Sequence, residues 1–294
     1  MNLVSYYKYI LSADIGGSHI TTAICDIENN IVLPHTVIRN ELNSKDGSDI
    51  ILNIWIATIK ETLKKFQFPV SGIAFAMPGP FDYINGVSYI NGLDKYEALF
   101  ELDIKTIIAN AFDFAPEMIL FRNDAEATIA GEVFAGAGRG YDRLTGITLG
   151  TGFGSALFKE GIARELNWGS AAYQDSIADD YFTTRWFCRR YNQLTGISIS
   201  GVKELAIAAE KSAVAREVFE QFSDNLAEFL KQNTTQINPD VLLVCGNIAK
   251  ASQLFLPNLI KRSGIKIITA KLGEEAALIG AAALFSSVTS LTKT

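Results

Sequence analysis

Both halves of this 294-residue chain open with the same local pattern, an apolar strand, a glycine-containing turn and a second apolar strand. In the first half, residues 9–18 read YILSADIGGS, and in the second half, residues 145–154 read TGITLGTGFG. An internal repeat of this kind predicts two similar domains that face each other. The alternative is a pair of unrelated β-hairpins, because tight turns use glycine in any case.

The segments between and after these turns alternate between strand-like and helix-like patterns. Strands are expected at residues 9–13, 20–27, 31–38, 70–76, 118–121, 144–149, 155–158, 241–245 and 265–268. Helices are expected at residues 52–66, 97–112, 125–135, 176–191, 202–210, 213–236 and 274–285. The first three strands predict an antiparallel meander, and the later alternation predicts parallel pairing. The expected fold class is therefore α/β, with mixed sheets covered by helices.

Composition and charge exclude several classes of protein. Hydrophobic residues make up 48% and charged residues 20% of the chain, which is typical of a globular protein rather than a disordered one. The formal net charge of −6 argues against a nucleic-acid partner, which needs clustered Lys and Arg. No secretion signal is recognisable at the start, and the longest nearly apolar stretch, residues 276–285, is too short to span a bilayer. We expect a cytoplasmic protein without a membrane partner.

The two glycine turns are candidate phosphate-binding sites. Adjacent glycines let backbone N–H groups approach an anion closely, and Gly16-Gly17 follows Asp14, which can hold Mg²⁺ directly or through water. The turn lacks the GxxxxGK[ST] pattern of a P-loop and the GxGxxG pattern that opens a dinucleotide-binding helix. Gly150-Thr151-Gly152 is the second candidate. Two such turns facing each other would hold a nucleoside triphosphate between two domains.

Asn123-Asp124 stands between the expected strand 118–121 and the expected helix 125–135. A carboxylate at the carboxyl end of a strand faces the crevice where α/β sheets bind ligands. There Asp124 would accept the proton of a substrate hydroxyl that attacks a γ-phosphoryl group. The alternative is that Asp124 only caps the helix.

The order of these motifs resembles that of the ROK sugar kinases, a family of the actin-like ATPase superfamily, over nearly the whole chain. Asp14-Ile15-Gly16-Gly17 resembles the first phosphate motif of the family, and Leu149 to Gly154 the second. Residues 123–138 follow the pattern N-D-A-x-x-x-x-x-G-E-x-x-x-G-A-G. Further matches are Gly72 to Pro80, Gly86-Val87, Asn91-Gly92-Leu93, Gly246-Asn247-Ile248 and Gly280-Ala281-Ala282.

This resemblance implies roles for individual residues. Asp124 would be the catalytic base, and the sugar would contact Asn91, Asn123 and Asp124. Asp14 would lie near Mg²⁺, with a water molecule between them. The residues expected to bind ATP are Asp14, Gly16, Gly17, Ser18, His19, Gly150, Thr151, Gly152, Gly246 and Asn247. The last two would border the nucleoside, and the others the phosphates and their metal ion.

The same resemblance implies an architecture. Two actin-like (ribonuclease H-like) α/β domains would enclose a cleft. The first domain would comprise residues 1–122 and 281–294, and the second residues 123–280. A homodimer is expected by resemblance only.

One segment departs from the family pattern. Family members usually carry E-x-G-H after the second phosphate motif and then a C-x-C-G-x-x-G-C zinc loop. Residues 161–173 contain no histidine and no cysteine, so we predict no zinc site. Glu165, Asn167 or Gln174 are candidate substitutes for the missing sugar ligands. The loss raises an alternative function, a catalytically idle sugar- or nucleotide-binding protein. A third, a sugar-responsive repressor, would need a DNA-reading module before Asp14, where this sequence has thirteen residues.

Overall fold

The computed structural model describes residues 8–286 and divides them into two compact units. Unit 1 consists of residues 8–136 and 274–286, and unit 2 of residues 137–273. The outermost parts of the expected first domain, residues 1–7 and 287–294, lie outside the described residues. None of the helices between residues 8 and 286 combines the length and the apolar character needed to cross a bilayer.

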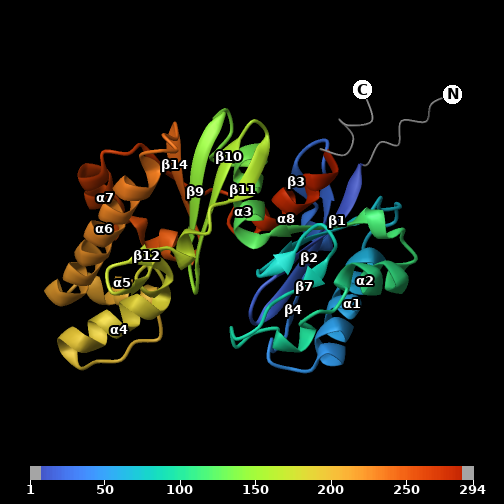
Figure 1. Cartoon of the computed structure of the whole chain (residues 1–294), viewed down its shortest axis with the longest axis horizontal. Helices are drawn as coiled ribbons and strands as arrows, with labels where there is room; N and C mark the ends of the chain where they lie inside the picture. The colour runs from blue at the N-terminus through green and yellow to red at the C-terminus, as the bar shows by residue number, and fades with distance from the viewer. Residues whose placement is uncertain (1–7, 287–294) are drawn as a thin grey trace. The chain divides into compact units, whose positions relative to one another are not determined.

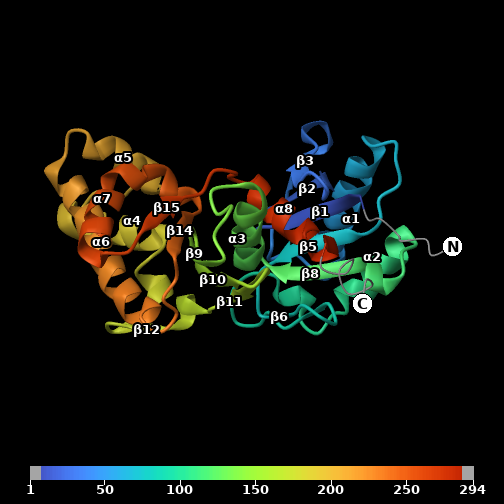
Figure 2. The ribbon, with the colours of Figure 1, turned by 90° about the horizontal axis from the view of Figure 1, so that it is seen from above.

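Unit 1 is built on a six-stranded mixed sheet in the order β3-β2-β1-β5-β8, with β4 also paired to β2 (Figures 1 and 2). Its strands are β1 (Tyr9–Ile15), β2 (His19–Asp26), β3 (Ile31–Val32), β4 (Ile38–Glu41), β5 (Ile73–Met77) and β8 (Ile119–Asn123). β1, β2 and β3 pair antiparallel, whereas β1, β5 and β8 run parallel. The expected antiparallel start and mixed sheet are confirmed.

Helices cover both faces of this sheet. Helices α1 (Ser48–Lys64) and α2 (Ile104–Phe112) pack on one face, and α3 (Asp124–Ala135) and α8 (Glu275–Ala282) lie on the other (Figure 2). Side chains alternate along a strand, so Leu11, Ala13 and Ile15 join Trp55 of α1 in one core. Asp14, out of step with those three residues, points to the face of α3 and α8.

Unit 2 repeats the same strand order, β11-β10-β9-β14-β15. Its strands are β9 (Arg143–Leu149), β10 (Phe153–Lys159), β11 (Ile162–Glu165), β14 (Val241–Cys245) and β15 (Ile267–Thr269). Again the first three pair antiparallel and the others parallel. Helices α4 (Thr184–Thr195), α5 (Val202–Ala209), α6 (Ala213–Thr234) and α7 (Leu256–Ser263) lie on one side of the sheet (Figure 2). The internal repeat predicted from the two glycine turns is therefore real, and the mixed α/β fold class is confirmed.

Three expected elements differ from the structure. The expected strand 31–38 is interrupted by a 3-10 turn at Pro34–Thr36, because proline supplies no N–H to a strand ladder. The expected helix 97–112 begins at Ile104, after a 3-10 turn at Glu97–Leu99. The expected helix 176–191 is wrong in its first half. A hairpin of β12 (Ala172–Tyr173) and β13 (Ser176–Ile177) and a 3-10 turn at Ala178–Asp180 precede α4.

The remaining elements are short. Strands β6 (Phe81–Asp82) and β7 (Val87–Ser88) form a hairpin. Further 3-10 segments span Pro116–Met118, Trp168–Ser170 and Asn247–Leu254.

Helix α3 belongs to unit 1 because it crosses α8 at backbone contact. A Cβ atom on Gly131 would lie 1.9 Å from the Ala276 carbonyl oxygen, and one on Gly280 would lie 1.7 Å from the Ala127 carbonyl oxygen. The Arg122 guanidinium also donates to the Gly280 carbonyl at 2.8 Å. The first compact unit therefore continues to residue 136, whereas the sequence analysis placed the boundary between the two domains at residue 123.

We expect Gly280→Ala to lower the free energy of unfolding by at least about 2 kcal/mol, because the added methyl forces α3 and α8 apart. At an open helical position the same change would raise the free energy of unfolding by about 1 kcal/mol. The sign of the measured change therefore tests whether α3 and α8 cross at backbone contact. Urea unfolding is the measurement. Gly47→Ala is the control, and its effect should stay below about 1 kcal/mol, since no described residue except its chain neighbours comes within 4 Å of its Cβ position. A neutral or stabilising Gly280→Ala would contradict the close crossing.

Candidate functional site

The predicted catalytic residues of unit 1 lie at one edge of its sheet. Strands β1, β5 and β8 run parallel, with Asp14 opposite Ala76 and Met77 opposite Asn123. Their carboxyl ends therefore meet, which places Asp14 at the end of β1 beside Asp124, the first residue of α3. Both side chains are half-buried.

These two carboxyl groups influence each other. Burial, the charge of Asp124 and the charge of Glu274 raise the pKa of Asp14 to about 7, against an opposing effect of Arg39. Burial also raises the pKa of Asp124, while the Ala125 amide and the Lys95 ammonium act in the opposite direction. Arg39 and Glu274 form an ion pair at 2.8 Å within the same unit. The edge thus concentrates carboxylates that are costly to ionise without a cation nearby.

Asn123, and not Asp124, is the N-cap of helix α3. The Asn123 Oδ1 atom accepts hydrogen bonds from the amides of Ala125 at 2.9 Å and Glu126 at 3.2 Å. Its Nδ2 atom donates to the Tyr83 hydroxyl at 3.1 Å, and that hydroxyl donates to the Met77 carbonyl at 3.2 Å. The Asp124 Oδ1 atom accepts a hydrogen bond from the adjacent Ala125 amide at 2.8 Å. The capping alternative for Asp124 is wrong, and Asn123 can reach a ligand only with its second amide hydrogen.

The first glycine turn joins β1 to β2. The Gly16 amide donates to the His19 carbonyl at 3.0 Å, and the Tyr96 hydroxyl donates to the Gly16 carbonyl. The His19 ring covers Gly16, where a Cβ atom would lie 2.7 Å from the ring. Burial and the charge of Arg39 lower the pKa of His19. Gly17 and Ser18 are exposed, and so is Asn91, which lies on the segment after β7.

The predicted nucleotide residues of unit 2 also gather at one edge. The turn Gly150–Gly152 joins β9 to β10. Chain neighbours aside, the nearest atom among residues 8–286 lies 4.0 Å from a Cβ position on Gly150 and 3.6 Å from one on Gly152. Gly246 follows β14, which runs parallel to β9, and adopts a φ of 89° that favours glycine. A Cβ atom there would lie 2.3 Å from the Leu149 carbonyl oxygen. Gly246 therefore lies directly beside the second glycine turn. Both Gly246 and the following Asn247 are exposed.

Two residues that the sequence did not single out hold this turn in place. Asp179 Oδ1 accepts from the Phe153 amide at 2.7 Å, and Thr184 donates to the Gly150 carbonyl from its amide at 2.8 Å and from its hydroxyl at 3.1 Å. Arg185 pairs with the other oxygen of Asp179 at 2.6 Å. The sequence analysis expected one helix over residues 176–191, and a continuous helix would not predict these contacts.

Glu165 is exposed at the end of β11, opposite Ala156 of β10.

Aromatic packing anchors residues 161–173, the segment that lacks the cysteines of the family's zinc loop, at its last residue, Tyr173. The Tyr173 ring packs 5.2 Å from the Phe182 ring and 5.6 Å from the Phe229 ring, measured between centroids. The Tyr173 hydroxyl donates to the Asn225 carbonyl at 3.0 Å. In the described part of the chain, no group of three or more His, Cys, Asp or Glu side chains is placed to hold a metal ion.

Comparisons with known proteins match nearly the whole length of this chain. The model of the ROK family matches residues 10–172 and 178–288, which leaves residues 173–177 outside the match. The glucokinase of Thermotoga maritima is 22% identical, and the alignment covers 94% of this chain and 96% of that protein. The N-acetyl-D-glucosamine kinase of Mannheimia succiniciproducens is 25% identical over 92% of this chain and 97% of that protein.

A solved structure shares the fold. The ROK family glucokinase of Streptomyces griseus, in complex with glucose and AMPPNP, superposes with a TM-score of 0.76 at 20% identity. The superposition covers 94% of this chain and 98% of that one. The two units therefore have the actin-like fold expected from the sequence.

The raised pKa of Asp14 predicts a measurable dependence of stability on pH. In the unfolded chain this carboxyl ionises near its ordinary pKa of 3.8, and in the folded chain only near 7. Its contribution to stability is therefore present at low pH and is lost as the pH rises toward 7. We expect Asp14→Asn to gain stability relative to the wild type by on the order of 2 kcal/mol between about pH 5 and about pH 8. Urea unfolding without nucleotide or divalent cation measures this, and a difference that does not change with pH would contradict it.

Proposed function

This chain belongs to the ROK family, and from that premise we propose that it is an ATP-dependent sugar kinase that phosphorylates a hydroxyl of a hexose or hexose derivative. The observation that carries the proposal is the half-buried Asp124 carboxyl beside Asp14, at the carboxyl edge of β1, β5 and β8. The relatives named as glucokinase and N-acetyl-D-glucosamine kinase support the same class of substrate.

Asp124 acts as the general base in this proposal. Asn123 satisfies the two amides at the start of α3, so the second oxygen of Asp124 is available to a substrate hydroxyl. The Lys95 ammonium favours the ionised carboxylate, which is the form that accepts a proton. Asn123 orients the sugar with its second amide hydrogen, and Asn91 and Glu165 contribute further contacts.

The glycine turns fit the phosphates of ATP. The Cβ positions of Gly150 and Gly152 meet only ordinary van der Waals contacts, at 4.0 Å and 3.6 Å, and Asp179 and Thr184 hold the backbone of the turn in a fixed shape. Preorganised amides stabilise a phosphate without reorganising when it binds. Gly246 and Asn247 lie beside this turn and would border the nucleoside. In unit 1, Gly16, Gly17, Ser18 and His19 form the corresponding turn.

A magnesium ion fits the carboxyl edge of unit 1. Mg²⁺ is usually held by one or two carboxylates, substrate phosphates and water, and Asp14 lies beside Asp124, where the charge of Arg39 opposes only part of the rise in the pKa of Asp14. When bound, the ion neutralises charge on the phosphates. Asp14 would hold it through a water molecule.

The homodimer expected from the family resemblance remains a prediction.

We expect Asp124→Asn to lower sugar-dependent ADP release by a factor of about 10² to 10⁴, because the amide cannot accept the hydroxyl proton. The measurement is coupled ADP release with Mg·ATP across hexoses, amino sugars and N-acetylated sugars. Asp113→Asn is the matched control, since Asp113 is exposed and has a φ of 56°, a conformation that Asn also adopts. Its turnover should equal that of the wild type.

A second measurement separates the kinase from an idle binder. Departure from the family pattern in residues 161–173 motivates that alternative. A thermal-shift screen with the same sugars reports binding that does not require turnover. Stabilisation by a sugar without ADP release from any sugar of the panel would favour the idle binder. An Asp124→Asn variant as active as the wild type would remove Asp124 from the role of base.

A further inference from the structure

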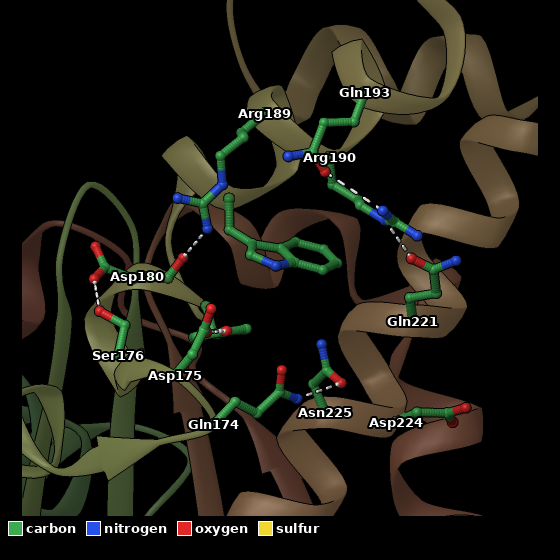
Figure 3. A pocket seen from close by; sticks show the side chains of 12 residues that line it. Gln174, Asp175, Ser176, Asp180, Arg189, Arg190, Gln193, Gln221, Asp224 and Asn225 are labelled. Carbon is green, nitrogen blue, oxygen red and sulfur yellow. Dashed lines mark hydrogen bonds between the residues drawn. The ribbon is translucent and has the colours of Figure 1, made fainter.

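Unit 2 contains a polar pocket of about 660 Å³ that none of the proposed catalytic or nucleotide residues lines (Figure 3). Three elements form its wall: the β12–β13 hairpin with the following 3-10 turn, helix α4 and helix α6. Its volume lies in the range of pockets that bind small molecules. Tyr181 and Trp186 supply apolar surface, and the other lining side chains are polar or charged.

Opposite charges face this pocket without forming ion pairs with one another. Arg189 donates to the backbone carbonyl of Asp180 at 3.0 Å, and Arg190 donates to the Gln221 side-chain oxygen at 2.7 Å. The Asp175 carboxylate accepts from the Tyr181 hydroxyl. The ion pairs found among residues 8–286 join neither arginine to a carboxylate of this wall. Neutral partners therefore orient each charged group while leaving it able to bind a ligand (Figure 3).

The carboxylates next to these arginines are held in the same way. The Asp180 carboxylate accepts from the Ser176 hydroxyl. The third carboxylate of the wall, Asp224, is already neutralised by Arg262 at 2.7 Å, a residue outside the lining. The guanidinium groups of Arg189 and Arg190 and the carboxylates of Asp175 and Asp180 are then the charged groups left in the wall, and their formal charges cancel.

This charge balance selects a class of ligand. An anion would meet Asp175 and Asp180, and a cation would meet Arg189 and Arg190, so neither is favoured. A hydroxyl group both donates and accepts, so it can bridge a guanidinium and a carboxylate that do not reach each other. Hydrogen bonds to charged groups are the stronger kind. Vicinal hydroxyls with an apolar C–H face, as in a sugar, match the donors, acceptors and rings of this wall.

The pocket includes Gln174, one of the candidate substitutes for the missing sugar ligands, but none of the residues proposed for phosphoryl transfer. Neighbouring residues of one 3-10 turn face different ways: Asp179 binds the Phe153 amide at the glycine turn, and Asp180 lines the pocket. Gln174, Asp175 and Ser176 of the wall also fall in residues 173–177, the stretch that the family match leaves out. These three wall residues thus lie outside the part of the chain that the family model matches.

We propose that this pocket is a second carbohydrate site, which binds a neutral mono- or disaccharide between α4, α6 and the β12–β13 hairpin. The proposal does not depend on the kinase activity, because binding here needs neither nucleotide nor Asp124.

Calorimetric titration of the nucleotide-free full chain with glucose, N-acetylglucosamine, maltose and sucrose tests the proposal. We expect at least one of these sugars to bind about tenfold more weakly to Arg190→Ala, because a charge-assisted hydrogen bond is lost. Arg189→Ala, at an exposed position where truncation does not threaten folding, should weaken the same sugar. Arg139→Ala, an exposed arginine outside the lining, is the control and should change the affinity less than twofold. Asp124→Asn should leave this binding event in place.

Three outcomes would overturn the proposal. One is that neither Arg189→Ala nor Arg190→Ala weakens any of the four sugars. Another is that these variants weaken only glucose 6-phosphate, used as an anionic probe, which would make the pocket an anion site. The third is that they change only the sedimentation of the protein, which would make the wall an interface between copies of the chain. Failure of the kinase assay, by contrast, would leave the binding result unaffected.

Discussion

The position of the proposed base depends on two helices that touch at their backbones. Glycine at positions 131 and 280 lets α3 and α8 approach until a single methyl group would collide with a carbonyl oxygen. Helix α8 in turn covers β1 and β5, which end at the same edge as β8. Asp124 is therefore fixed from two directions, by the end of β8 before it and by the α3–α8 crossing behind it. Asp14 reaches the same edge through β1, so the pair is a consequence of sheet register and helix packing together.

Electrostatics then gives this edge its chemistry. Burial raises the pKa of both Asp14 and Asp124, and each is a poor place for an isolated negative charge. Lys95 and Arg39 offset only part of that cost. An edge of this kind gains most from a bound cation and from a substrate that supplies a proton. The stability that the apo protein loses at high pH is the counterpart of that gain.

The sequence predicted the features that repeat or that rest on glycine, and missed those that depend on packing. The pattern shared by residues 9–18 and 145–154 predicted two similar sheets, which have identical strand orders. Asn123 and Asp124 are adjacent residue types that both favour helix starts, so only geometry could decide which one caps α3. Apolar residues between 176 and 191 fit helical spacing, yet Tyr173 and Phe182 pack into an aromatic core that requires a hairpin and a turn first. The assignment of α3 to unit 1 likewise follows from a crossing that no local pattern encodes.

The 3-10 turn Ala178–Asp180 supports two different surfaces with consecutive residues. Asp179 is bound to the Phe153 amide and to Arg185, whereas the Asp180 carbonyl accepts from Arg189 and its carboxylate from Ser176. A change at Asp180 would therefore shift the backbone that carries Asp179 and, through it, the second glycine turn. Arg189 and Arg190 extend from α4 and do not contact that glycine turn through any of their hydrogen bonds. Truncating them is thus the change that separates the pocket from the phosphate turn, and altering the turn itself would confound the two.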